Sequence, residues 1–94
     1  MTREEILTGA GDCVLRDRDA QYGSPENSFE MIADLWTAYL NKRTIIAPRD
    51  VAAMMALLKI ARISRSRKSD NWVDLAGYAA CGGEIDDKEP KTTG

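Results

Sequence analysis

The chain has 94 residues, the length of one small domain. Its composition, 44% hydrophobic and 30% charged, is typical of a globular protein and excludes a fully disordered chain. The formal charge of −2 disfavours binding of nucleic acid over the whole surface, and no sequence-specific nucleic-acid partner is expected. No apolar run is long enough to cross a membrane, and the N-terminus lacks the apolar stretch of a secretory signal. A cytoplasmic protein is therefore expected.

Histidine is absent from the sequence. This excludes Ser-His and Cys-His nucleophile pairs and every metal site with a histidine ligand. Any catalysis would have to use carboxylates, lysine, tyrosine or a hard cation held by carboxylates, and the sequence leaves open whether the protein is an enzyme. Cys13 and Cys81 lie in apolar helical patterns, which favours buried free thiols over a disulfide.

The first two predicted helices cover residues 3–18 and 25–41. Thr2 followed by Glu5 predicts a capping box at the start of the first helix. Pro25 fits the first position of the second helix, which is apolar on two nearly opposite sides. Such a helix packs in two directions, and one of them can be another subunit.

The third and fourth predicted helices cover residues 48–64 and 70–82. The third is apolar all round apart from Lys59 and Arg62, which predicts a central, buried helix. A glycine pair is expected to end the fourth helix.

Together these patterns predict an all-α fold, a compact bundle of about four helices. The bundle is expected to form a single domain over residues 1–83, followed by a disordered tail over 84–94. A chain of this length builds only a modest core, so a homo-oligomer is also expected.

Lys59 is the most informative residue because a lysine within an apolar helix needs a partner. Arg62 lies three residues further on, and two neighbouring cations call for an anion between them. Asp74, the only charged residue of the fourth helix after its first turn, is the matching acid. Two interpretations stay open: a buried Lys59–Asp74 pair that fixes the helix register, or the same residues open to a nucleotide phosphate or a cation.

A second acidic group consists of Glu26, Glu30 and Asp34, spaced four residues apart. The spacing is typical of a solvated polar stripe, but it also suits a set of oxygen ligands. Glu26 and Glu30 facing Asp70 and Asp74 across a helix pair would supply the carboxylates that Mg²⁺ prefers.

Two further features can contact a ligand. Tyr22 lies in a turn and can either stack on a base or pack against the bundle. The stretch 59–68 carries five cations and no acid, so it can meet phosphates or an acidic partner. Its simpler interpretation is a basic helix end that complements the helix dipole.

Longer motifs resemble a short phage and prophage family of unknown function. Residues 18–29 read Arg-x-x-x-Tyr-Gly-Ser-Pro-Glu-x-x-Phe, and residues 35–40 read Leu-Trp-x-x-Tyr-Leu. Residues 50–62 read Asp-Val-Ala-x-Met-Met-x-Leu-Leu-Lys-Ile-Ala-Arg, and residues 70–80 read Asp-x-Trp-Val-Asp-Leu-Ala-Gly-Tyr-Ala-Ala. The resemblance covers most of the expected ordered chain.

More distantly, a Lys-x-x-Arg helix followed by Asp-x-x-x-Asp-x-x-x-Tyr is similar to the nucleotide-modification-associated domains of phages. These in turn are similar to all-α, MazG-like nucleotide pyrophosphohydrolases. The resemblance implies a Mg²⁺ site, with Asp70 and Asp74 also in catalytic roles, and a set of nucleotide contacts. The implied metal ligands are Glu26, Glu30, Asp70 and Asp74. By the same resemblance, Lys59 and Arg62 would contact the phosphates. Tyr22 and Tyr78 are further candidates for nucleotide binding.

The leading hypothesis is therefore a phage-encoded protein, in the cytoplasm of the host cell, that binds a nucleotide or a nucleotide-derived small molecule. If the protein is an enzyme, this hypothesis makes it a Mg²⁺-dependent, MazG-like nucleotide pyrophosphohydrolase. The alternative is a noncatalytic phage interaction protein that blocks a host protein, such as a defence protein, or sequesters a nucleotide signal.

Overall fold

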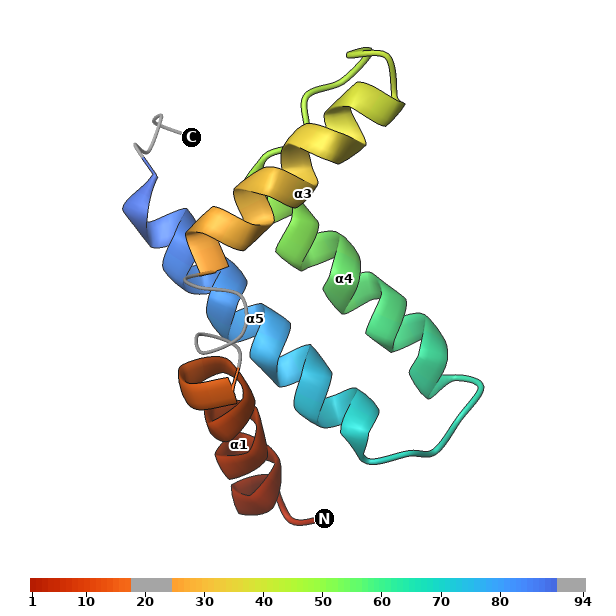
Figure 1. The fold of residues 1–94 in the computed structure, drawn as a ribbon. Helices are drawn as coiled ribbons and strands as arrows, with labels where there is room; N and C mark the ends of the chain where they lie inside the picture. The colour runs from red at the N-terminus through yellow and green to blue at the C-terminus, as the bar shows by residue number, and fades with distance from the viewer. Residues whose placement is uncertain (18–24, 90–94) are drawn as a thin grey trace.

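The computed structural model describes residues 1–17 and 25–89, of which 17 and 25–27 are described by their backbone alone (Figure 1). Over these residues the structure contains four α-helices, one π-helical turn and no strand. The elements are α1 (Arg3–Asp12), η1 (Cys13–Asp17), α3 (Pro25–Tyr39), α4 (Pro48–Ile63) and α5 (Asp70–Lys88). The predicted all-α fold is confirmed.

The helices are arranged around α5. α4 and α5 form an antiparallel hairpin, α1 packs on another side of α5, and α3 crosses the hairpin near the start of α4 (Figure 1). The buried core lies where α3, α4 and α5 meet. Its fully or nearly buried side chains are Phe29, Ala33, Val51, Ala52, Cys81 and Ile85.

Local hydrogen bonds explain where two of the helices begin. At α1, the Thr2 hydroxyl accepts from the Glu5 backbone N–H, and the Glu5 carboxylate accepts from the Thr2 N–H at 3.0 Å. This predicted capping box is confirmed, and its hydrogen bonds lower the pKa of Glu5. At α4, Pro48 occupies the first turn while the Ala47 N–H donates to the Asp50 carboxylate at 2.9 Å.

The loop between α3 and α4 is fixed by backbone geometry and one side chain. Asn41 and Lys42 adopt left-handed conformations, with φ of 55° and 59°, so the chain turns sharply after α3. The Thr37 hydroxyl then accepts a 2.9 Å hydrogen bond from the Ile46 N–H and ties the loop back to α3. α4 thereby begins beside the helix that it packs against.

The prediction for the end of the last helix was wrong. α5 continues through Gly82 and Gly83 to Lys88, so residues 84–88 of the expected tail are helical. Each glycine costs a helix about 1 kcal/mol, but burying the Ile85 side chain in the core returns about 1.5–3 kcal/mol. Residues 90–94 lie outside the described part of the chain.

Two further expectations are corrected. The central helix is α5, whereas α4 is half-exposed, with Leu57 and Ile60 among its exposed side chains. The first helix is also interrupted, because α1 ends at Asp12 and a π-helical turn follows. Cys81 is buried as predicted, but Cys13 is exposed, and the two cysteines are not joined in a disulfide.

Close contact between α4 and α5 depends on Gly82. A Cβ atom at Gly82 would lie 2.9 Å from the Ala52 Cβ, whereas one at Gly83 would meet nothing within 4 Å. We expect Gly82→Ala to be less stable than Gly83→Ala by about 2 kcal/mol, because both gain helix propensity but only the first forces the helices apart. Urea unfolding of the two variants measures this difference, and equal stabilities would contradict it.

Candidate functional site

The two charged side chains singled out in the sequence pair with each other. Lys59 Nζ lies 2.8 Å from Asp74 Oδ2, joining the middle of α4 to α5. The Lys59 side chain is only 11% exposed, while that of Asp74 is 39% exposed. The cation is therefore held inside the helix hairpin by a direct ion pair, which supports the structural interpretation of these residues.

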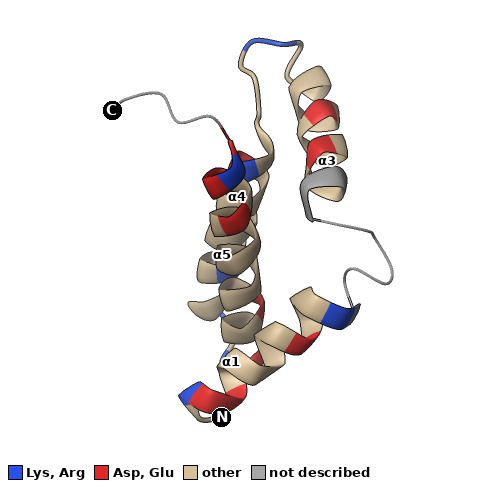
Figure 2. Ribbon diagram, turned by 90° about the vertical axis from the view of Figure 1, so that its left-hand side faces the viewer, with Lys and Arg blue, Asp and Glu red and all other residues tan. Residues whose placement is uncertain are grey.

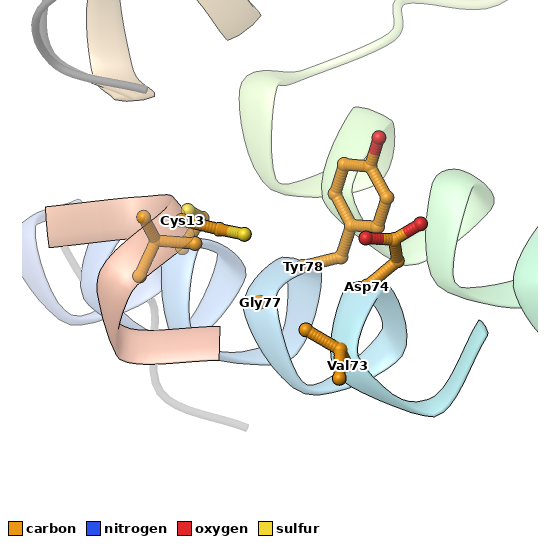
Figure 3. A pocket seen from close by; sticks show the side chains of 7 residues that line it. Cys13, Val73, Asp74, Gly77 and Tyr78 are labelled. Carbon is orange, nitrogen blue, oxygen red and sulfur yellow. The ribbon is translucent and has the colours of Figure 1, made fainter. Parts of the chain in front are cut away.

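A small cavity lies beside Asp74, on the side toward α1 and η1 (Figure 3). Its volume is about 120 Å³, well below the 300 Å³ or more that is usual for a small-molecule site. The lining residues are Cys13, Val14, Val73, Asp74, Gly77, Tyr78 and Cys81. Neither Lys59 nor Arg62 is among them, so this cavity does not join Asp74 to the two cations expected to contact a nucleotide phosphate.

The other predicted nucleotide contacts fall in different places. Tyr22 lies outside the described residues. Tyr78 is half-buried and packs near the core, its ring centroid 6.4 Å from that of Phe29. Arg62 is exposed at the end of α4 and lines a different surface hollow.

The predicted carboxylate ligands do not gather in the described part of the chain. Glu30 and Asp34 are exposed on α3, and Asp70 is exposed at the start of α5. Figure 2 shows the acidic residues of α3 set apart from α5. No group of three metal-binding side chains occurs among the residues whose side chains are described, and the side chain of Glu26 is not one of these. The described carboxylates of the predicted set therefore form no such group, and the Mg²⁺ site stays a prediction.

A larger hollow lies at the turn between α4 and α5. Its volume is about 440 Å³, within the range of small-molecule sites, and we call it the turn hollow. Its lining residues are Ala61, Arg62, Arg65, Ser66, Lys68 and Asn71. Three of these six are cations and none is an acid.

The cations of the turn hollow have no anionic partner within the described ranges. The ion pairs there involve neither Arg62, Arg65 nor Lys68. The turn folds this way because the backbone N–H groups of Arg65 and Ser66 both donate to the Arg62 carbonyl, which curls the chain at the end of α4. The side chains at 62, 65 and 68 are thereby brought to one place.

Asn71 completes the turn hollow in a way that the sequence did not indicate. Asn71 is only 8% exposed, yet its side-chain amide has no hydrogen-bond partner among the described residues. Leaving a buried polar group unsatisfied costs about 1–3 kcal/mol. The burial of Asn71 is a property of the folded chain that no local pattern in the sequence indicates.

The chain matches the family "Domain of unknown function (DUF6378)" over residues 5–86. It belongs to this family. It is 40% identical over 79 residues to "Gene 55 protein" of Mycobacterium phage D29, covering 83% of the chain and 51% of that protein. It is 46% identical over 76 residues to "Gene 55 protein" of Mycobacterium phage L5, covering 79% of the chain and 47% of that protein.

These similarities confirm the predicted relationship to phage proteins of unknown function. The chain spans about half the length of the two phage proteins. No solved structure matches it significantly. Within the described residues, no helix is long and apolar enough to span a membrane.

The Lys59–Asp74 pair predicts an asymmetry in stability. Asp74→Ala leaves a buried lysine without an anion and should cost about 2 kcal/mol, reduced from the usual 3–5 kcal/mol because Asp74 is partly exposed. Lys59→Met leaves only a partly exposed carboxylate and should cost less than about 1 kcal/mol, and adding it to Asp74→Ala should restore stability. Chemical unfolding checks these values.

The control is Asp86→Ala, which breaks the exposed Arg49–Asp86 pair of the same 2.8 Å length. An exposed pair contributes about 0–1 kcal/mol. If Asp74→Ala is no more harmful than Asp86→Ala, the Lys59–Asp74 pair does not hold the hairpin together.

Proposed function

We propose that this phage-family protein binds a small phosphorylated ligand, such as a nucleotide, in the turn hollow. The supporting observation is that Arg62, Arg65 and Lys68 line one hollow without an acid, around the unpartnered amide of Asn71. Cations gathered at one place repel one another, and a phosphate group relieves that repulsion while accepting charge-assisted hydrogen bonds.

The neutral donors strengthen this proposal. Ser66 and Asn71 also line the hollow, and a serine hydroxyl and an asparagine amide can both donate to phosphate oxygens. Asn71 is fixed by its burial, so it can donate without first losing much side-chain freedom. A ligand oxygen would also satisfy a polar group that the folded chain leaves unsatisfied.

Charge on the rest of the chain favours a compact ligand over a nucleic-acid strand. Residues 59–68 carry five cations and no acid, whereas the other 84 residues carry eight cations and fifteen acids. A long phosphate backbone leaving the turn hollow would meet this net negative charge and be repelled. A di- or triphosphate group fits within the basic turn.

The proposed function is binding without catalysis. No carboxylate lines the turn hollow, so it offers cations for a phosphate but neither a Mg²⁺ ligand nor a carboxylate general base. MazG-like hydrolysis through Asp70 and Asp74 stays a prediction, as does the blocking of a host protein. The proposal keeps Arg62 as a ligand contact and assigns Lys59 to the fold.

Calorimetric titration with sodium tripolyphosphate and with ATP tests the proposal. Arg65→Gln should weaken binding of both at least about tenfold, since it removes a charged donor. Asn71→Leu, which keeps the side-chain size, should weaken binding by about fivefold or more without lowering the unfolding temperature. Arg43→Gln removes an exposed cation of the α3–α4 loop and should bind like the unchanged protein.

Three results would overturn the proposal. One is the absence of binding to either phosphate compound, and another is equal affinity in Arg65→Gln and Arg43→Gln. The third is tight binding of a single-stranded DNA oligonucleotide with none of tripolyphosphate. Release of phosphate from ATP by the bound complex would instead show an enzyme and contradict the noncatalytic form of the proposal.

A further inference from the structure

The outer face of α4 is apolar throughout its middle. Every exposed residue between positions 53 and 61 on this helix is uncharged and apolar. These residues, which we call the α4 face, are Ala53, Met54, Leu57, Leu58, Ile60 and Ala61. The charged residue within this segment, Lys59, is buried in its ion pair with Asp74 instead.

The α4 face is unusual for a surface helix. A helix that packs on one side normally carries polar residues on the other, but the outer side of α4 carries none over this segment. Leu57 is 62% exposed, and Met54, Leu58 and Ile60 are exposed as well. α4 lies at an edge of the molecule, on the far side of α5 from α1 (Figure 1). A continuous exposed apolar face of this kind marks an interaction surface.

The order of side chains along this face indicates which partner fits it. The pattern is nearly symmetric about Leu57, with alanines four residues away on both sides at 53 and 61. Large side chains lie three residues away on both sides, at Met54 and Ile60. An antiparallel copy of the same helix, related by a two-fold axis through Leu57, would therefore meet small residues with small and large with large.

The absence of exposed charge on the α4 face supports the same partner, a second copy of the chain. Interfaces of permanent homodimers are depleted of charge and resemble a domain core cut in half, whereas transient interfaces are about as polar as the ordinary surface. The exposed side of α3 differs, because Met31 and Leu35 are interspersed with exposed Glu30 and Asp34. Only the α4 face, among the described helices, combines several exposed large apolar residues with no exposed charge over such a length.

The core of the single chain is small, so a dimer interface would add substantially to the stability of the fold. Among the described residues, Phe29 and Val51 are the only large side chains that are fully buried, and much of the remaining core is alanine. A chain of 94 residues gains little from a core of this size. Pairing two α4 helices would bury the apolar side chains that the monomer leaves in water, at about 25 cal/mol per Å².

We propose that two copies of this chain form a symmetric dimer in which the α4 helices pack antiparallel, with Leu57 at the two-fold axis. The dimer places the two turn hollows at opposite ends of the paired helices. It does not depend on whether those hollows bind phosphate.

Sedimentation velocity over a range of protein concentrations tests the dimer. Leu57→Asp should raise the dimer dissociation constant at least about thirtyfold, because it buries a charge at the centre of the interface. The matched control is Leu35→Asp on α3, where the leucine is 63% exposed against 62% for Leu57. That variant should remain as dimeric as the unchanged protein. A monomer at all concentrations, or equal effects of the two substitutions, would overturn the proposal.

Disulfide trapping tests the orientation in the full chain carrying Cys13→Ser, which removes the exposed thiol. Leu57→Cys should cross-link with itself on mild oxidation, because residues on a two-fold axis come within disulfide reach. Ala53→Cys alone should not, but mixing it with Ala61→Cys should give a mixed disulfide. Cross-linking of Ala53→Cys with itself would indicate parallel helices and contradict the antiparallel pairing.

Discussion

The Lys59–Asp74 ion pair is the constraint on which the rest of the structure depends. A nearly buried ammonium group can persist only where a carboxylate meets it directly, so α4 and α5 are held in one register. That register brings Gly82 against Ala52 and allows the two helix backbones to approach closely. It also sets where the chain turns between the helices. The ion pair therefore contributes to the geometry of the hairpin.

The register has a consequence for the charges further along α4. With Lys59 engaged by Asp74, the side chains of Arg62, Arg65 and Lys68 have no acid in the described residues to neutralise them. They converge at the turn, next to the buried amide of Asn71. The fold thus separates two groups of cations that are contiguous in the sequence. One cation is used inside the hairpin, and the others are left facing the solvent.

Local signals in the sequence were sufficient for some of these features. The Thr2–Glu5 capping box and the start of α4 at Pro48 follow from spacing, because each involves short-range geometry. The need of Lys59 for a counter-charge indicated Asp74 as its partner, but the sequence did not decide whether the two form a closed pair. The end of α5 could not be predicted, since the burial of Ile85 that carries the helix past two glycines is a tertiary effect. The proposed turn hollow includes Arg62 from the predicted set, but Asn71 becomes informative only through its burial. The apolar side chains on all sides of α4 led to the prediction of a central helix. Sequence periodicity alone does not distinguish a helix face that the same chain covers from one that is left exposed.

The positions of the interhelical ion pairs bear on how the hairpin moves. Two pairs bridge α4 and α5 in the described structure, Arg49–Asp86 at one end and Lys59–Asp74 in the middle. Beyond the second pair, toward the turn, the two helices are joined by packing alone. Local opening should therefore begin at the turn and stop at Lys59, so that backbone amides near Ser66 exchange with solvent sooner than those near Val51. The part of the hairpin that carries the unpaired cations is also the part most free to adjust its shape.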